Sequence, residues 1–286
     1  MAPPESEPSQ GTASRLIGPV VGTLEYIGER AFGLLAHVGD MVILFGASLG
    51  WFGRSMVNRK GRKGNSALVF QIVRVGFRSI FIVALVSGCV GLILALQLAP
   101  PLDGFGQREL IANIVGVAVL RELGPLIGAI VLTGFAGASI AAEIGTMVVS
   151  EEVEALEAHA LNPIRFLVVP RVMATILSMT ALGVIASTVS IAASMAVSIT
   201  ILDIPLTTYV RNTLLQAKFV DFATGTMKST VFGALIGLIA CGNGLKVTGG
   251  AAGVGNATTG TVVQSVVAIV IADLVFTAIF YALKLV

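Results

Sequence analysis

Between Ser79 and Ala99 the chain runs for 21 residues without a charged side chain. A transmembrane α-helix needs about 20 consecutive apolar residues to cross a hydrocarbon core roughly 30 Å thick. Further apolar stretches follow at about residues 110–142, 172–201, 229–245 and 261–283. The sequence therefore predicts an all-α, polytopic membrane protein with five transmembrane helices.

The composition excludes the main alternatives to a membrane protein. Hydrophobic residues make up 55% of the chain and charged residues 12%, whereas soluble domains are about 45–50% apolar and about 25% charged. A mean hydropathy of +0.93 is too high for a water-soluble enzyme or a disordered chain. The two cysteines, Cys89 and Cys241, lie in apolar runs, so neither a disulfide framework nor a thiolate metal site is expected.

The region before the first span divides into two parts. Residues 1–14 are polar and rich in Pro and Glu, which is typical of a disordered tail. Residues 15–64 combine apolar residues at helical spacing, up to about Trp51, with a basic linker. The charges interrupting the apolar positions predict an amphipathic helix in the bilayer interface, and a soluble helix packed on the rest of the chain is the alternative. Residues 65–286 then form the membrane domain.

The distribution of basic residues predicts the orientation. Seven Lys and Arg residues and no acidic residue lie between Arg54 and Arg78. By the positive-inside rule this segment belongs in the cytoplasm, and most of the 18 Lys and Arg residues fall on the same side. We therefore expect a cytoplasmic N-terminus and, after five spans, a C-terminus on the outer side.

Four ionisable residues stand out because they lie within or beside the apolar runs: Arg121, Glu122, Lys228 and Asp273. A charge at the centre of a membrane helix costs about 2.5–3.5 kcal/mol on insertion scales. Such residues persist when they pair with one another or line a substrate site, and the sequence leaves both possibilities open. Lys228, at the predicted outer end of its span, could also extend its amine to the interface.

An acidic segment joins the second and third predicted spans. Ser150 is a candidate N-cap, and Glu151, Glu152 and Glu154 favour the start of a helix. The apolar residues Val153, Leu156 and Ala160 are predicted to share one face of it. This short helix is either a solvated loop element or a docking site for a cytoplasmic partner.

Prolines delimit the same segment. Asn162-Pro163 is predicted to end the acidic helix and begin another, because Pro suits the first helical position. Pro170 is predicted to break or kink the chain before the third span.

Several chemistries are not indicated. The phosphate-binding pattern GxxxxGK[ST] does not occur, so this chain is not expected to hydrolyse nucleotide. The glycine-rich run 249–255 predicts a flexible turn between the last two spans. His37 and His159 lie in no metal-ligand pattern. We expect no catalytic residue, metal or cofactor in this chain.

Several motifs occur together in the order of a known family: Leu120–Pro125, Ala136–Ser139, Ala142–Gly145, Glu152–Leu156, Asn162–Arg165 with Pro170-Arg171, Lys228–Phe232, Ala257–Val263 and Ala272–Phe276. From about Val69 to its C-terminus the chain strongly resembles the MlaE/YrbE permeases, the membrane subunits of ABC systems that move lipids. Asn162 departs from the family, which often has Asp before the Pro-x-Arg pattern.

The resemblance implies a homodimeric permease domain over residues 65–286, located in a bacterial inner membrane with a periplasmic C-terminus. It implies a cytoplasmic ATPase dimer that hydrolyses ATP, an MCE-domain protein on the outer side and, in some systems, a STAS-domain subunit. No nucleic-acid partner is expected. The family's charged positions correspond to Arg121, Glu122, Lys228 and Asp273. The coupling segment 148–170 and its surroundings would contribute Glu143, Glu151, Glu152, Val153, Leu156, Pro163, Arg165 and Arg171.

These features lead to a hypothesis of phospholipid transport, in which Arg121 or Lys228 lies near the anionic headgroup. Arg suits a phosphate because its planar guanidinium can donate two parallel hydrogen bonds. A secondary transporter that relays protons through Glu122 and Asp273 is one alternative, and a membrane scaffold that transports nothing is another.

Overall fold

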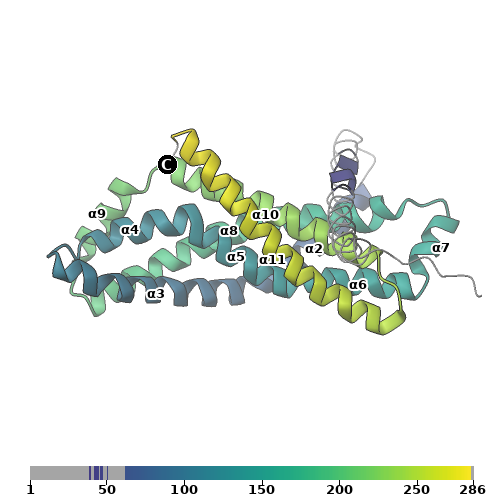
Figure 1. Ribbon diagram of the computed structural model, residues 1–286, viewed down its shortest axis with the longest axis horizontal. Helices are drawn as coiled ribbons and strands as arrows, with labels where there is room; N and C mark the ends of the chain where they lie inside the picture. Colours follow the sequence, from purple (N-terminus) through teal and green to yellow (C-terminus); the bar gives the residue numbers. More distant parts are fainter. Residues whose placement is uncertain (1–38, 40–41, 45, 48–49, 51–61, 285–286) are drawn as a thin grey trace, which may run out of the picture. The chain divides into compact units, whose positions relative to one another are not determined.

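The computed structural model of the protein describes residues 39, 42–44, 46–47, 50 and 62–284 (Figure 1). Every regular element among these residues is helical, as expected for the all-α class. The chain forms two compact units, Met1–Ile43 and Leu44–Val286. The predicted tail over residues 1–14 and nearly all of the predicted interfacial helix lie outside the described residues.

Among the described residues, five helical segments are long and apolar enough to cross a membrane: Ala67–Gly104, Leu110–Val149, Ile164–Thr200, Phe219–Leu245 and Gly250–Ala282. Their number confirms the prediction. Most of them extend well beyond the uncharged runs that revealed them, because each helix continues through charged residues that have partners or reach the surface. The longest has 40 residues, or about 60 Å of helix, so its ends must project beyond a core roughly 30 Å thick.

The first span is built from α2 (Arg62–Val75), the short 3₁₀-helix η1 (Phe77–Ser79) and α3 (Ile80–Gly104). Pro100 and Pro101, which directly follow the uncharged run, lie inside α3. Proline removes a backbone donor but retains a helical φ. The helix therefore continues for one more turn, and the chain then turns at Gly106, whose φ is 67°.

The second span contains α4 (Leu110–Ala118), the π-helical turn η2 (Val119–Leu123), α5 (Gly124–Leu132), the π-helical turn η3 (Thr133–Gly137) and α6 (Ala138–Val149). Pro125 near the start of α5 has no N–H to complete the regular α-helical pattern across η2. A π-helical turn accommodates this loss without breaking the helix. Arg121 and Glu122 therefore lie in a local widening within a continuous span.

The remaining elements are α7 (Glu152–Ala158), the π-helical turn η4 (Ile164–Val168), α8 (Val169–Thr200), α9 (Leu206–Gln216), α10 (Phe219–Leu245) and α11 (Gly250–Ala282). The α10 helix begins ten residues before the predicted position, Ser229. The prediction of a flexible turn over residues 249–255 is wrong beyond the first two glycines. Gly249 and Gly250 have φ values of 84° and 68°, and the small residues that follow continue as helix.

Close backbone contacts position α8 between α3 and α10. A Cβ atom on Gly91 of α3 would lie 2.1 Å from the Ser190 carbonyl oxygen of α8. A Cβ atom on Gly233 of α10 would lie 2.7 Å from the Thr175 carbonyl oxygen, which also belongs to α8. Glycine is required at such approaches because any side chain would push the backbones apart. The small residues of α10 therefore serve packing within one chain.

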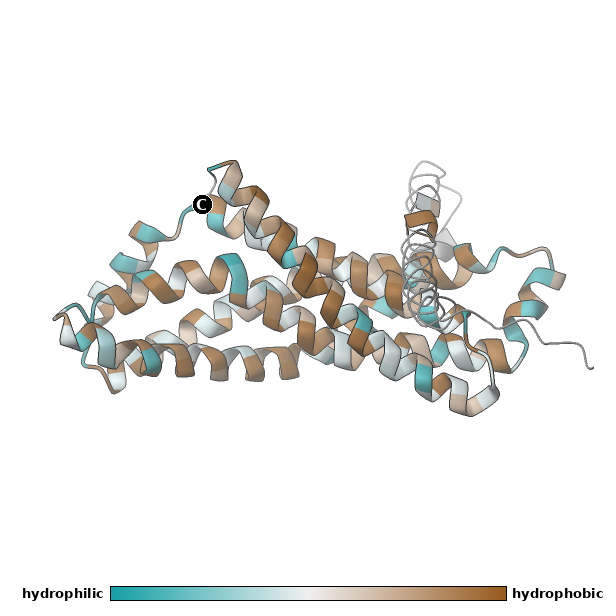
Figure 2. Ribbon diagram, in the orientation of Figure 1, coloured by the Kyte–Doolittle hydropathy of each residue, from teal (hydrophilic) through white to brown (hydrophobic). Residues whose placement is uncertain are grey.

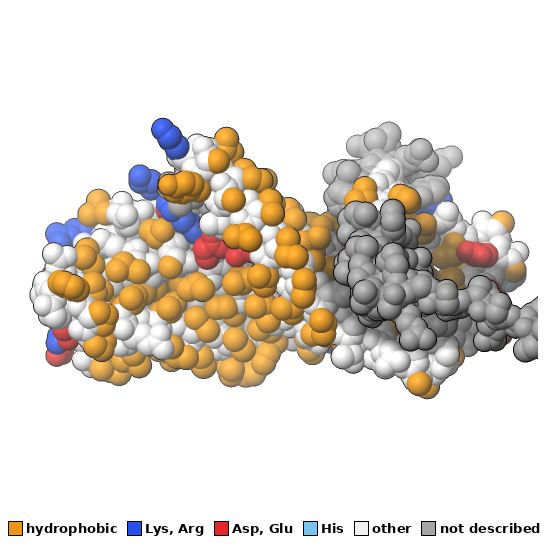
Figure 3. Space-filling view, viewed as in Figure 1, with side chains coloured by type: hydrophobic (Ala, Val, Ile, Leu, Met, Phe, Trp, Pro, Cys, Tyr) orange, Lys and Arg blue, Asp and Glu red, His pale blue; other side chains and the backbone are white. Residues whose placement is uncertain are grey.

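Apolar side chains dominate the exterior of the spans. Figure 2 shows hydrophobic residues along the lengths of α3 and α11, and Figure 3 shows them covering the same face. On α11 the exposed residues include Val263, Val267, Val270, Ile271, Leu274 and Val275. Such a surface would aggregate in water and is suited to contact with acyl chains.

The short α9 helix is attached to α8 by a buried tyrosine. Tyr209 is 1% exposed, and its hydroxyl donates a hydrogen bond of 3.1 Å to Ser194 Oγ. Burial raises the pKa of Tyr209, and the hydrogen bond to Ser194 partly offsets that rise. The phenol therefore stays protonated and available as a donor at neutral pH.

Candidate functional site

A buried lysine joins three of the spans. Lys228 Nζ of α10 lies 2.5 Å from Glu122 Oε1 of η2 and 2.9 Å from Asp273 Oδ1 of α11. Its side chain is 1% exposed, and the amine also donates to Thr277 Oγ1 at 3.0 Å. Because α10 begins at Phe219, Lys228 lies well inside its helix. The interpretation that it extends to the interface is therefore wrong.

Thr277 completes this lysine cluster, which comprises Glu122, Lys228, Asp273 and Thr277. Its hydroxyl contacts Glu122 Oε1 at 2.7 Å and the Asp273 carbonyl oxygen at 2.9 Å. The cluster holds two carboxylates around one ammonium, which compensates the desolvation of the buried lysine. It connects the first third of the second span to the last two spans.

Arg121 takes a different partner. Its Nε lies 2.5 Å from Asp221 Oδ1 of α10, and the Asp221 side chain is 1% exposed. Asp221 also accepts the backbone N–H of Lys218 at 2.8 Å, which satisfies a donor at the start of α10. Asp221 was not among the residues predicted from the sequence to lie at this site. An acid three residues into a helix that starts after Ala217-Lys218 was the available signal.

The π-helical turn η2 presents two adjacent charges to the same helix. Arg121 and Glu122 pair with Asp221 and Lys228, which lie seven residues apart and so on one face of α10. The structure thus brings Glu122, Lys228 and Asp273 together and places Arg121 beside them on the same helix pair. A direct role of these four residues in substrate binding stays a prediction.

A second ionic cluster lies nearer to α7. Glu143 of α6 lies 2.6 Å from Arg74 Nη1 of α2 and 3.0 Å from Arg171 Nη2 of α8. Arg171 is 4% exposed and donates to the Leu167 carbonyl oxygen at 2.8 Å. Glu143 and Arg171, both predicted to couple the chain to an ATPase, thus connect α2, α6 and α8 within the bundle.

The acidic segment forms α7, but its N-terminus differs from the prediction. Ser150 is not an N-cap, because its hydroxyl donates back to the Thr146 carbonyl oxygen at 3.0 Å at the end of α6. The chain then turns at Glu151, whose φ is 59°. Glu151 and Glu152 are exposed, whereas Val153 and Leu156 are half-buried on one face.

The C-terminal side of α7 departs from the prediction in two places. Ala160 does not share the face of Val153, because it lies past the helix end with a φ of 57°. Asn162 Oδ1 accepts the N–H groups of Ile164 and Arg165 at 3.0 and 3.3 Å, so Asn162-Pro163 begins the next helix as predicted.

Pro170 does not break the chain before the third span. It lies near the N-terminus of α8, directly after the π-helical turn η4. The wider turn accommodates the missing proline donor, and the span Ile164–Thr200 stays continuous.

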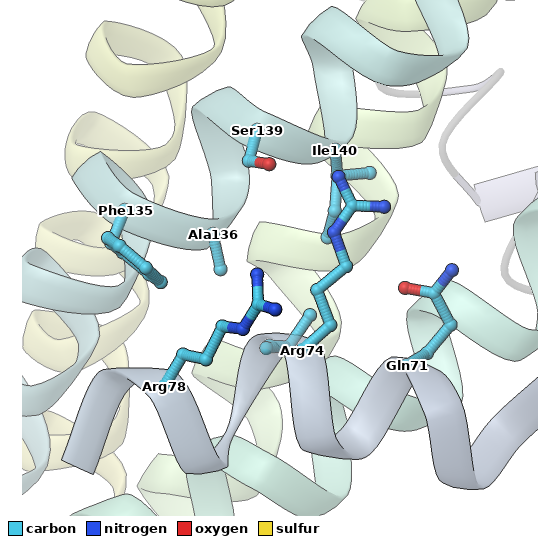
Figure 4. Close-up of a pocket in the computed structure, with 8 residues that line it drawn as sticks. Gln71, Arg74, Arg78, Phe135, Ala136, Ser139 and Ile140 are labelled. Carbon is cyan, nitrogen blue, oxygen red and sulfur yellow. The ribbon is translucent and has the colours of Figure 1, made fainter.

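A cavity of about 110 Å³ separates the first span from the second near these ionic residues (Figure 4). Its lining comes from α2, η1, η3 and α6: Gln71, Arg74, Val75, Arg78, Phe135, Ala136, Ser139 and Ile140. In the sequence, Arg74 and Arg78 stand out only as members of the basic segment. Their position opposite η3 depends on helix packing, which no local signal in the sequence indicates.

Residues 68–279 match the sequence profile of the family described as Permease MlaE. The chain belongs to the MlaE permease family. Over 216 residues it is 38% identical to a probable ABC transporter permease protein of Rickettsia prowazekii, covering 76% of this chain and 83% of that relative. A probable ABC transporter permease protein of Synechocystis is 35% identical over 214 residues, 75% of this chain and 81% of the relative.

The chain is also similar to a plant protein whose name refers to a lipid. Protein TRIGALACTOSYLDIACYLGLYCEROL 1, chloroplastic, of Arabidopsis thaliana is 36% identical over 211 residues, which is 74% of this chain and 60% of that protein. The MlaE permease described here is thus a multi-pass membrane transport subunit similar to ABC permeases. Both ionic clusters, α7 and the cavity lie within the matched residues.

Proposed function

We propose that this MlaE permease is the membrane subunit of an ABC-type transport system for phospholipids. The match of residues 68–279 to the family, on a fold with five candidate spans, is the observation that carries the proposal. The name of the Arabidopsis relative includes the word for a diacylglycerol lipid. That name supports a substrate of the glycerolipid class.

In the proposed assembly two copies of the chain form the lipid pathway in a bacterial inner membrane. A cytoplasmic ATPase dimer hydrolyses ATP, and an MCE-domain protein continues the pathway on the outer side. A STAS-domain subunit is a further proposed partner. The basic segment Arg54–Arg78 supports a cytoplasmic N-terminus. With five spans, α7 then lies in the cytoplasm and the C-terminus in the periplasm.

Movement of α7 is the proposed link between ATP and the lipid. The exposed acidic residues of α7 are available to a partner, and α7 is joined directly to the ends of the second and third spans. The Glu143 contacts to Arg74 and Arg171 connect these spans to α2. A displacement of α7 would therefore shift three helices together, as a rigid-body transition.

The proposal is tested by reconstituting the permease with its co-expressed ATPase in liposomes and following a fluorescent phospholipid. ATP-dependent lipid movement is the expected result. Movement driven by a proton gradient in the absence of ATPase would instead favour a secondary transporter. In that case the two carboxylates around Lys228, those of Glu122 and Asp273, would be the groups that relay protons. No movement with all partners and ATP would favour a scaffold.

A double substitution on α7 tests the docking role directly. We expect Glu152→Lys with Leu156→Asp to reduce ATPase co-purification about tenfold or more. The double substitution reverses a charge and removes an apolar contact, and together these changes should weaken binding by about 1.4 kcal/mol or more. Both positions lie outside the spans, so the permease should stay folded. Quantitative affinity purification measures the ratio of the two subunits.

The matched control is Arg211→Glu with Leu214→Asp on α9, where both residues are exposed. It repeats the charge reversal and the apolar-to-acid change on a helix at the other end of the spans, and it should leave the subunit ratio unchanged. Equal recovery of ATPase with the α7 variant and the parent protein would contradict the docking role.

A further inference from the structure

The described residues that line the cavity between the first two spans include cationic side chains and no acidic one. Its lining includes two guanidinium groups, those of Arg74 and Arg78 (Figure 4). Arg74 pairs with Glu143, but that carboxylate also pairs with Arg171. Within the part of the chain that the structure describes, Arg78 has neither an acidic nor a hydrogen-bonding partner. Among the described residues, the Glu143 carboxylate thus serves both Arg74 and Arg171, and Arg78 is left without an anionic partner.

The cations predicted to bind an anionic headgroup are in a different situation. Arg121 is paired with Asp221, and Lys228 is enclosed by Glu122 and Asp273. An anion arriving at either residue would have to displace a carboxylate already in contact. Arg78 requires no such exchange, so it is the better candidate for a phosphate.

The polar lining of the cavity complements a phosphate ester. Gln71 is 8% exposed, and its Oε1 is buried with no hydrogen-bond partner among the described residues. Since a buried acceptor without a donor is unfavourable, a ligand that brings a hydroxyl or ammonium group would satisfy it. Ser139 lines the opposite wall and offers a hydroxyl donor. The cavity volume of about 110 Å³ is far above the roughly 10–15 Å³ that one water needs.

The position of the cavity agrees with a lipid headgroup. Ser139 lies ten residues before the end of the second span at Val149, or about 15 Å along the helix. A helix of about 60 Å centred on a core roughly 30 Å thick would place that level at the edge of the hydrocarbon. Phe77 and Phe81 beside Arg78 are 71% and 76% exposed and can contact acyl chains.

We propose that this cavity binds the phosphodiester headgroup of a membrane glycerophospholipid. Arg78 donates to the phosphate oxygens, Ser139 adds a hydroxyl donor, and Gln71 accepts from the alcohol or amine substituent. The acyl chains lie outside the cavity along the apolar faces of the first span. This site deepens the proposed function, because it assigns the headgroup contact of the same lipid substrate class.

The test measures phosphatidylglycerol retained by the purified permease in detergent, counted by native mass spectrometry. We expect Arg78→Ala to lower the retained lipid about tenfold, the effect of losing roughly 1.4 kcal/mol of charge-assisted hydrogen bonding, and Arg78→Lys to lower it less. The matched control Arg211→Ala removes an exposed arginine of α9 and should change nothing. Thermal unfolding verifies that each variant is folded.

A second variant keeps the arginine and blocks the cavity. Ser139→Leu places a larger apolar side chain in the lining and should lower lipid retention as Arg78→Ala does. Equal retention in Arg78→Ala, Ser139→Leu and the parent protein would overturn the proposal. Diacylglycerol, which lacks the phosphate, should show no dependence on Arg78.

Inorganic phosphate distinguishes a lipid site from a site for the free ion. Phosphate that binds in an Arg78-dependent manner, without phosphatidylglycerol competing for it, would overturn the lipid assignment. The measurement uses no ATPase and no gradient, so its outcome is independent of transport. Failed lipid movement together with Arg78-dependent retention would reject the proposed transport function and leave the headgroup site standing.

Discussion

The variant Lys228→Met is expected to be strongly destabilised. Removing the ammonium leaves Glu122 and Asp273 facing each other at the centre of the lysine cluster without a cation. Breaking a buried ion pair from one side typically costs about 3–5 kcal/mol. The lower figure, about 3 kcal/mol, applies here because the Glu122 side chain is 33% exposed and partly screened. The unfolding midpoint in detergent, followed by intrinsic fluorescence, provides the measurement.

The control for this prediction removes the charges together. Combining Lys228→Met with Glu122→Gln and Asp273→Asn leaves no uncompensated charge in the cluster, and most of the lost stability should return. If Lys228→Met unfolds at the same temperature as the parent protein, the cluster does not hold the spans together. A triple variant less stable than Lys228→Met would equally contradict the argument.

We expect Gly91→Val to disrupt the packing of α3 on α8. A Cβ atom at position 91 would lie 2.1 Å from the Ser190 carbonyl oxygen, which is backbone and cannot rotate away. The two helices would have to separate along their contact. Overpacking typically costs about 1–3 kcal/mol and occasionally more, and a backbone obstacle places this variant at about 3 kcal/mol. Monodispersity on size exclusion and the unfolding midpoint both report the effect.

Gly260→Val is the matched control, because a Cβ atom on Gly260 of α11 would meet no atom within 4 Å. The same substitution there should change stability by less than about 1 kcal/mol, the range of helix propensities between the two residues. Similar unfolding midpoints for the two glycine variants would show that the contact between α3 and α8 tolerates a side chain.

The number of spans was predictable because hydrophobicity alone determines which segments can cross a bilayer. The first and last residues of each span were harder to predict from the sequence. The uncharged run of the fourth span starts at Ser229, but the helix begins at Phe219. It can do so because Asp221 and Lys228 are each neutralised by a partner from another span. Residues 249–255 were predicted to form a turn because glycine favours turns in isolation, but α11 begins at Gly250.

At the site, too, the sequence predicted which charged residues matter but not how they pair. Their cost in a membrane marked Arg121, Glu122, Lys228 and Asp273 as requiring partners. The pairing itself depends on which helices are neighbours, and so Asp221 was missed.

Hydrophobic patterning and backbone chemistry thus sufficed for the class of protein, the five spans, the acidic helix between the second and third, and the start of the next helix at Asn162-Pro163. These are properties of short segments, and their energies are set by the residues within them. The ion pairs of Lys228 and Glu143, the contact of Gly91 with Ser190, and the cavity beside Arg78 arise where segments distant in the chain meet. Their energies depend on separation and burial, which are properties of the packed bundle.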